Sequence, residues 1–159
     1  MSEAGIRLRP AGPADSRLLW ELRNEDSVRR ASFHPKAIPI EEHERWFARK
    51  MGDARFRAFV AVDPAGKDVG YVRFDLDGEE AEISVAIDKG ERGKGYGLAA
   101  IRAGSERMLA EGPARRVIAL VRRDNPASLA AFERAGYRAA GGKSLQGVEG
   151  IVLVFGDGG

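Results

Sequence analysis

Apolar and polar residues follow one another with two spacings along this chain, and these spacings divide it into strands and helices. Alternation, or a short run of apolar residues, predicts strands at 6–11, 55–63, 67–76, 80–88, 115–123, 137–141 and 149–156. Apolar residues three or four positions apart, with helix-starting and helix-ending residues around them, predict helices at 13–23, 39–51, 97–111 and 125–136. The mixture predicts an α/β fold with one mixed sheet and about four helices.

Three of the predicted strands follow one another with only short turns between them. The segments 55–63, 67–76 and 80–88 are separated by the turn sequences PAG and DGE, which favours an antiparallel meander. The apolar centre of 115–123 is unbroken, as expected for a strand buried on both faces. The glycine-rich segment 141–147 is predicted to be a loop between the last two strands.

Composition disfavours several classes of function. The chain has 159 residues, of which 43% are hydrophobic, and this suits one domain spanning 1–159. Its formal net charge of +2 gives little reason to expect a nucleic-acid partner. No segment reaches the roughly 20 apolar residues of a membrane span, and the N-terminus lacks the apolar core of a signal peptide, so a cytoplasmic protein is expected. With no cysteine and only two histidines, no metal site is expected.

The sequence ERGKGYG, residues 91–97, stands between a predicted strand and a predicted helix. Glycine carries no Cβ, so a backbone of this composition can approach an anion closely, and the start of a helix adds partial positive charge. Arg92 and Lys94 add two cations, which either pair with the anion or are simply solvated. The segment therefore predicts a phosphate-binding loop.

Two familiar kinds of phosphate loop do not fit this segment. A Walker loop requires Ser or Thr directly after Gly-Lys, whereas Gly95 follows Lys94 here, so the hydroxyl that would hold magnesium is absent. A dinucleotide fingerprint requires the spacing G-x-G-x-x-G after a buried parallel strand. Here the spacing is G-x-G-x-G after the last strand of a meander, and a second βαβ half is missing. A helix-entry turn with no ligand remains an alternative.

The pattern Arg92-x-x-Gly95-x-Gly97, at a strand-to-helix turn, resembles the pyrophosphate loop of the GNAT acetyltransferase superfamily. The sequence NPASLAAFERAGY, residues 125–137, resembles that superfamily's second cofactor segment, Asn-x-x-Ala/Ser-x-x-x-aromatic followed by Gly-aromatic. One helix and one strand separate the two segments, as in the family. The resemblance implies a mixed central sheet with a splay between its two central strands, acetyl-CoA as co-substrate and no metal.

The resemblance also assigns residues to the cofactor. The end of the strand 80–88 would pair with the extended amide arm of coenzyme A. Asn125 would bond that arm, cap its own helix, or do both. The implied cofactor-binding residues are Val85, Ala86, Ile87, Arg92, Gly93, Lys94, Gly95, Tyr96, Gly97, Asn125, Ser128 and Phe132.

Acetyl transfer to an amine requires a neutral amine, a donor for the thioester oxygen and a proton source for the thiolate. The resemblance assigns the oxygen donor to the backbone N–H of Ile87 or a neighbour. The family often uses a tyrosine as the proton source, but Phe132 stands at that position. Water or another group must then serve, with Tyr96 and Ser128 as weak candidates.

Glu82, on the strand 80–88, is the implied catalytic base. It alternates with Ile83 and Val85 and is therefore expected on the opposite face of the sheet from them. The alternative is a solvated strand residue without a catalytic role. The turn-side carboxylates that could replace it are Glu79, Glu80 and Asp75.

The segment 22–47 is dense in polar and aromatic residues and is the predicted acceptor site. Its arginines surround an expected interhelical turn, where they either bind an anion or are solvated helix ends. His43 shares a helical face with Trp46 and is either an acceptor ligand or a core histidine. The candidate substrate-binding residues are Arg23, Asn24, Arg29, Arg30, His43, Trp46 and Phe74, with Phe33 as a further aromatic partner.

With an Arg-Asn at 23–24, a Val-Arg at 28–29 and a Glu-His-x-x-Trp at 42–46, this segment also resembles the acetyltransferases that act on UDP-4-amino-sugars in the pseudaminic-acid pathway. That resemblance implies a small-molecule amine acceptor, most directly an amine on a nucleotide-linked sugar. A second resemblance, to enzymes that acetylate the N-termini of ribosomal proteins, leaves a protein acceptor as an alternative. A non-catalytic acyl-CoA-binding sensor is an alternative of another class, and a homodimer is compatible with all three.

Overall fold

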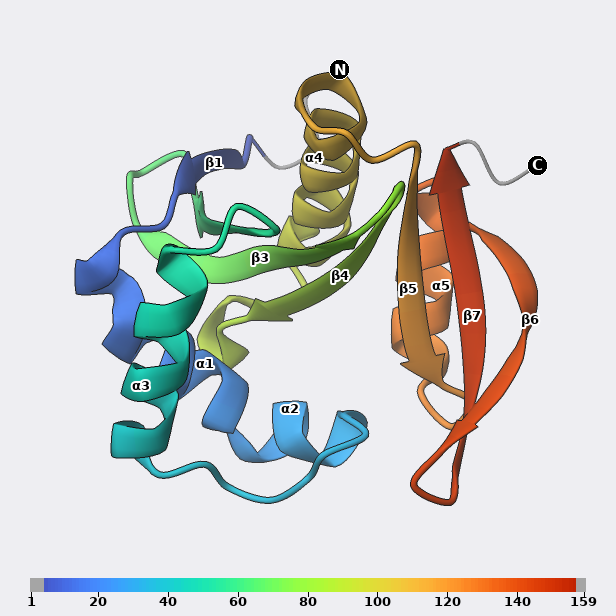
Figure 1. The fold of residues 1–159 in the computed structure, drawn as a ribbon, viewed down its shortest axis with the longest axis horizontal. Coiled ribbons are helices and arrows are strands. Elements are labelled where there is room, and N and C mark those ends of the chain that lie inside the picture. The colour runs from blue at the N-terminus through green and yellow to red at the C-terminus, as the bar shows by residue number, and fades with distance from the viewer. Residues whose placement is uncertain (1–4, 157–159) are drawn as a thin grey trace.

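Seven strands form one mixed sheet in the computed structural model, which describes residues 5–156 (Figure 1). Their order across the sheet is β1-β2-β3-β4-β5-β7-β6. The strands are β1 (Arg7–Pro10), β2 (Phe56–Val62), β3 (Asp68–Asp77), β4 (Glu80–Ile87), β5 (Arg116–Arg122), β6 (Arg138–Leu145) and β7 (Val148–Gly156). The predicted α/β class and the antiparallel meander β2-β3-β4 are confirmed.

Five α-helices lie within the described residues, and they cover both faces of the sheet (Figure 1). The helices are α1 (Ser16–Asn24), α2 (Asp26–Ala31), α3 (Ile40–Met51), α4 (Tyr96–Glu111) and α5 (Pro126–Arg134). Residues of α4 and α5 share one buried cluster with the strands, whereas residues of α1 and α3 share another. Successive residues of β2 alternate between these clusters, as the pleat of a strand requires.

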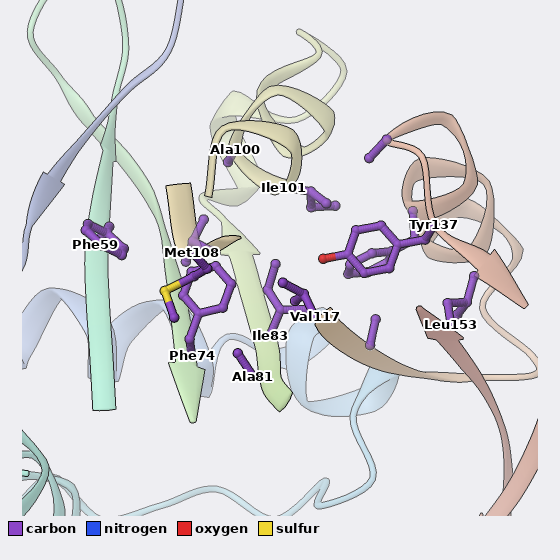
Figure 2. Packing of buried hydrophobic residues seen from close by; sticks show 14 of the residues in the cluster. Phe59, Phe74, Ala81, Ile83, Ala100, Ile101, Met108, Val117, Tyr137 and Leu153 are labelled. Atoms are coloured by element: carbon purple, nitrogen blue, oxygen red, sulfur yellow. The ribbon is translucent and has the colours of Figure 1, made fainter. Parts of the chain in front are cut away.

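The cluster beneath α4 includes Phe74, which the sequence suggested as an acceptor ligand (Figure 2). Its side chain is fully buried and meets the ring of Phe59 edge to face, with ring centres 6.3 Å apart. Gly104 of α4 packs directly above it, because a Cβ at that glycine would lie 3.1 Å from the Phe74 ring. Phe74 is therefore a core residue, and its assignment to the acceptor is corrected.

The two central strands separate soon after they meet. The strand β4 pairs with β3 along its whole length, but its parallel register with β5 covers only residues 80–82 and 116–118. Beyond Glu82 the strands diverge and leave an open wedge between residues 83–87 of β4 and 119–122 of β5 (Figure 1). The splay that the family resemblance implied is confirmed.

Two elements differ from the sequence prediction. The expected turn between the first two long helices contains α2, and the Glu25 carboxylate caps this helix by accepting from the backbone N–H of Ser27. The expected loop 141–147 is mostly strand, because β6 runs to Leu145 and a two-residue turn at Gln146 and Gly147 leads into β7. Both turn residues have positive φ, 53° and 78°, as a tight hairpin of this kind requires.

The strand β5 is also less enclosed than its apolar sequence suggested. Val117, Ala119 and Val121 are buried, whereas Ile118 and Leu120 on the opposite face are half-buried. Leu120 lines the cavity that the diverging strands create. The prediction of burial on both faces is therefore wrong, because the face of β5 that carries Ile118 and Leu120 is only partly covered.

Candidate active site

A cavity of about 870 Å³ occupies the wedge between β4 and β5. Its lining runs from the glycine loop and the start of α5 at one end to α2 and the middle of β3 at the other. A volume of this size is ample for a small-molecule ligand. The cavity thus brings together the two sequence segments predicted to bind the cofactor and part of the segment predicted to bind the acceptor.

The glycine loop reaches the cavity through Gly93, Gly95 and Gly97. Gly93 and Gly95 each have a φ of 82°, a conformation that favours glycine, and Gly95 is the N-cap of α4. The free N–H groups of the first turn of α4 therefore begin at the cavity wall. A Cβ at Gly97 would make only an ordinary contact, 3.7 Å from Ile87. Packing within the protein does not require glycine at 97, whereas close approach of a ligand would.

The two cations of the loop are held by neighbouring carboxylates. Lys94 Nζ donates to Glu91 at 2.9 Å, and Lys94 is not part of the cavity lining. Arg92 lines the cavity and donates to Ser27 Oγ at 2.6 Å and to Glu25 at 3.0 Å. Arg92 thus ties the glycine loop to the junction of α1 and α2, so the cofactor end of the cavity touches the acceptor end.

The edge of β4 that faces the wedge carries free backbone groups. The N–H of Asp88 donates to the carbonyl of Val69 on the β3 side at 2.8 Å. This bond shows that the even-numbered residues of β4 direct their backbone groups toward β3. Since every second residue of an antiparallel ladder bonds to the partner strand, Ile83, Val85 and Ile87 point their backbone groups away from β3. Among residues 5–156, no strand pairs with Val85 or Ile87 there, although the carbonyl of Ile87 already accepts from Arg92 Nε at 3.2 Å. An extended amide chain could use these groups by strand addition.

The start of α5 forms the opposite wall. Asn125 Oδ1 accepts from the backbone N–H of Ser128 at 3.2 Å, so the capping role of Asn125 is confirmed, and both residues line the cavity. Phe132 also lines it and packs edge to face on Tyr137, with ring centres 5.0 Å apart. The Tyr137 hydroxyl shares a 2.5 Å hydrogen bond with Ser105 in the core, and burial raises the pKa of Tyr137. Tyr137 therefore does not replace the missing tyrosine.

Glu82 lies at the vertex of the wedge, at the last position where β4 and β5 pair. Its side chain is exposed and lines the cavity, and it has no hydrogen-bond or ion-pair partner among the described residues. Ile83 faces the core beneath α4, so the predicted opposite orientation of Glu82 agrees with the structure. The alternative carboxylates pair with cations: Glu79 with Arg115, Glu80 with Arg116, and Asp75 with Lys50 and Arg73.

The candidate acceptor residues divide into two groups. Arg23, Arg29 and Phe33 line the cavity, whereas Asn24, Arg30, His43 and Trp46 do not. Asn24 holds Ile38 by two hydrogen bonds of 2.9 Å, from its amide nitrogen to the Ile38 carbonyl and from the Ile38 N–H to its amide oxygen. Arg30 is exposed on α2, away from the cavity.

His43 is a core histidine. Its side chain is fully buried, stacks on Phe47 and donates from Nε2 to the carbonyl of Ser16 at 2.9 Å. Burial lowers its pKa, and the nearby Arg23 guanidinium lowers it further. His43 is therefore neutral and supports α3 against α1, so the expectation that it contacts the acceptor is corrected.

The cavity residues that were not foreseen from the sequence include Tyr71, Arg73 and Ser84. They lie on the face of β3 and β4 that also carries Asp75 and Glu82, and the register places Arg73 opposite Ser84 and Asp75 opposite Glu82. The alternation of the strand 67–76 could have placed Arg73 beside Asp75 on one face. Its closeness to the first helix could not be read from the sequence, because it depends on the tertiary fold.

Comparison with known structures gives the same fold. The spermidine N-acetyltransferase from Vibrio cholerae, in complex with CoA and spermine, superposes with a TM-score of 0.85 at 19% identity and 94% coverage of both chains. A chimera of the Vibrio cholerae enzyme superposes with a TM-score of 0.83 at 18% identity and 95% coverage of both chains. At these identities the likeness concerns the fold. No curated protein sequence matches the chain.

Two features are absent from residues 5–156. None of the helices there combines the length and the apolar character needed to cross a bilayer. No group of three or more metal-ligating side chains lies together in the same residues.

A protein-family model matches most of the chain. The model of the acetyltransferase (GNAT) domain matches residues 6–138, which include the meander, the glycine loop, α4, β5 and α5. The splayed strands and the glycine loop at the start of α4 agree with that match. This chain belongs to the GNAT acetyltransferase family.

Proposed function

We propose that this protein transfers the acetyl group of acetyl-CoA to an amine of a small molecule. The observation that carries the proposal is the wedge, which has an unpartnered carboxylate, Glu82, at its vertex and a helix-opening glycine loop at its other end. A carboxylate and a set of free backbone donors in one cavity are the groups that amine acetylation needs.

In this proposal acetyl-CoA enters along β4. Its pyrophosphate binds the N–H groups around 93–97, and its amide arm pairs with the backbone of Val85 and Ile87. The amine nitrogen attacks the thioester carbonyl carbon, the carbon–sulfur bond breaks, and the acetyl group becomes an amide. A backbone N–H of β4 stabilises the negative charge that develops on the carbonyl oxygen.

The position of Glu82 decides how the amine loses its proton. Strand residues rise about 3.3 Å each, so Glu82 and Ile87 lie roughly 16 Å apart along β4. Glu82 could not serve a reaction centred at Ile87, so we place the oxygen donor at Val85, roughly 10 Å from Glu82 along the strand. Glu82 then accepts the amine proton through water.

The departing thiolate needs a proton, and Phe132 cannot supply one. Because an ordinary thiol has a pKa of about 8.5, water near neutral pH suffices for this step. We expect Phe132→Tyr to change turnover by less than about threefold, since the acid step is not limiting. Steady-state kinetics with acetyl-CoA checks this, and a rise of about a hundredfold would show that the native enzyme lacks a limiting acid.

Among the acceptors, an amine on a nucleotide-linked sugar fits the proposal best. Such an acceptor has a diphosphate, a ring and one amine, and the lining of the cavity includes Arg23, the Phe33 ring and Glu82. Arg29 also lines the cavity, but its guanidinium already pairs with Asp26 and donates to the carbonyls of Asn24 and Pro35. Sugar and terminal α-amines are less basic than lysine, whose pKa is about 10.4, and suit a base that works through water. Internal lysines are therefore disfavoured, and protein N-termini remain the alternative acceptor.

An acetyl-CoA-dependent assay with three groups of acceptors tests the proposal. These are nucleotide-linked amino-sugars, peptides with ribosomal-protein N-termini, and free amines that include spermidine. Thiol release together with an acetylated product from the first group is the expected result. If only the peptides are acetylated, the acceptor is a protein N-terminus and not an amino-sugar. Tight binding of acetyl-CoA without any product would make the protein a sensor.

A further inference from the structure

Two arginines from different parts of the chain each lie against one tryptophan ring. The guanidinium carbon of Arg23, on α1, lies 4.8 Å from the ring centre of Trp46, and that of Arg73, on β3, lies 5.0 Å from it. The two cations are thus no more than roughly 10 Å apart, about one Debye length at 0.1 M salt. Both residues line the cavity, with the Trp46 ring as their support.

Neighbouring carboxylates do not neutralise this pair. Within the described part of the chain, no carboxylate lies in ion-pair distance of Arg23, whose guanidinium contacts His43 Nδ1 at 3.4 Å. Arg73 reaches Asp75 at 3.5 Å, but Asp75 also accepts from Lys50 Nζ at 2.9 Å. One carboxylate therefore serves two cations, while His43 is neutral.

Burial makes the uncompensated charge costly. Desolvation lowers the pKa of Arg23, repulsion from Arg73 lowers it further, and Tyr71 and Glu42 offset this only in part. Two like charges in a partly buried place are stabilised when an anion joins them, and guanidinium groups bind phosphate and carboxylate in fixed geometry. The two guanidinium groups therefore favour binding of an anionic group supplied by a ligand.

The pair sits on the same sheet face as the candidate base. Arg73 is directly opposite Ser84 in the register, and Glu82 is opposite Asp75, one step further along. Side chains diagonal to each other on neighbouring strands are roughly 7–8 Å apart, so Arg73 and Glu82 begin at about this separation. Ser84 lines the cavity between them, and the described residues offer its hydroxyl no partner.

We propose that Arg23 and Arg73, supported by the Trp46 ring, bind a phosphate or carboxylate group of the acceptor while its amine faces Glu82. This inference rests on the proposed function and narrows the acceptor to an anionic amine. It separates the chain from a polyamine enzyme, because a polycation would meet two arginines and, among the described residues that line the cavity, one carboxylate without a partner. The spermine-bound structure from Vibrio cholerae shares the fold. We nevertheless expect this chain to bind a different acceptor.

The chain's two tryptophans provide a direct test by NMR. The protein is saturated with CoA, so that the glycine loop is occupied, and is then titrated with inorganic pyrophosphate and, separately, with malonate. We expect the indole N–H signal of Trp46 to shift and to saturate. The signal of Trp20, whose indole N–H donates to the Ile38 carbonyl at 2.7 Å, should stay in place and report an intact fold. The anion that binds more tightly identifies the phosphate or the carboxylate class.

Matched charge changes locate the subsite. Arg23→Gln and Arg73→Gln should each raise the dissociation constant of the bound anion at least about tenfold, or 1.4 kcal/mol. Arg45→Gln removes the same charge next to Trp46 from an exposed position outside the cavity and should leave the constant unchanged. Arg73→Lys keeps the charge, and its dissociation constant should lie between those of the parent protein and Arg73→Gln. With an anionic acceptor, Arg73→Gln should raise KM more than it lowers kcat.

The outcomes separate this inference from the proposed function. A Trp46 signal that responds to neither anion, or an Arg73→Gln variant that binds like the parent, would overturn the anion subsite even if amines are acetylated. A failure to acetylate any amine would overturn the proposed function even if the anions bind at Trp46. Faster acetylation of spermidine than of every anionic amine would contradict the subsite alone.

Discussion

Replacing Glu82 by glutamine should slow acetyl transfer roughly a hundredfold at about pH 6 and only a few-fold at about pH 9. An acceptor amine with a pKa of about 8 is mostly protonated at the lower pH, so the reaction there depends on a group that takes the proton. At the higher pH the amine is already neutral, and the carboxylate matters less. The dependence of kcat/KM on pH, measured for both proteins, checks this expectation.

The structure makes this substitution a clean one. Glu82 is exposed and unpartnered, so glutamine leaves the fold and the packing of β4 unchanged. Glu80→Gln is the comparison, because Glu80 is two residues away on the same strand face but pairs with Arg116 at 2.9 Å. A loss in Glu82→Gln that is uniform across pH would remove the base role from Glu82. A larger loss of kcat/KM in Glu80→Gln than in Glu82→Gln would assign the role of base to Glu80.

Replacing Gly97 by valine should lower the affinity for acetyl-CoA at least tenfold, or about 1.4 kcal/mol. A Cβ at this position meets only Ile87, at an ordinary distance of 3.7 Å, so the protein itself can accept it. The added methyl groups would stand beside the N–H groups at the start of α4 and keep the pyrophosphate away from them. Calorimetry with acetyl-CoA measures the effect.

Gly90→Val is the matched control for this prediction. Gly90 lies seven residues earlier, in the turn Lys89–Glu91, outside the cavity lining, and a Cβ there meets no atom within 4 Å. Its affinity for acetyl-CoA should equal that of the parent protein. Unchanged affinity in a folded Gly97→Val variant would reject the assignment of the glycine loop to the cofactor.

The sequence predicted those parts of the fold that are determined locally. Alternation, helical spacing and the glycines of 91–97 determine strands, long helices and the loop, and these elements lie where they were expected. The helix α2 was missed, because its six residues are too few to show a helical repeat. The strand β6 was shortened in the prediction, because Gly141 and Gly142 suggest a loop although both belong to an exposed edge strand.

The candidate site was predictable where one short segment supplies it. The loop 92–97, the end of β4 and the start of α5 all line one cavity, apart from Lys94. The acceptor side was predicted less well, because its side chains come from separate elements. Arg23 gains its role from Arg73, fifty positions later, whereas Asn24 and His43 are used to hold the helices together. Helical spacing alone does not distinguish such supporting residues from ligand contacts.

Hydrogen exchange on the intact protein, with and without acetyl-CoA, tests the central claim most directly. If the wedge holds the cofactor, the amides of Val85 and Ile87 and those of 93–97 should exchange more slowly when acetyl-CoA is bound. The amides of the exposed edge strand β6 should not change. Protection confined to other segments, or none at saturating acetyl-CoA, would contradict the placement of acetyl-CoA between β4 and β5.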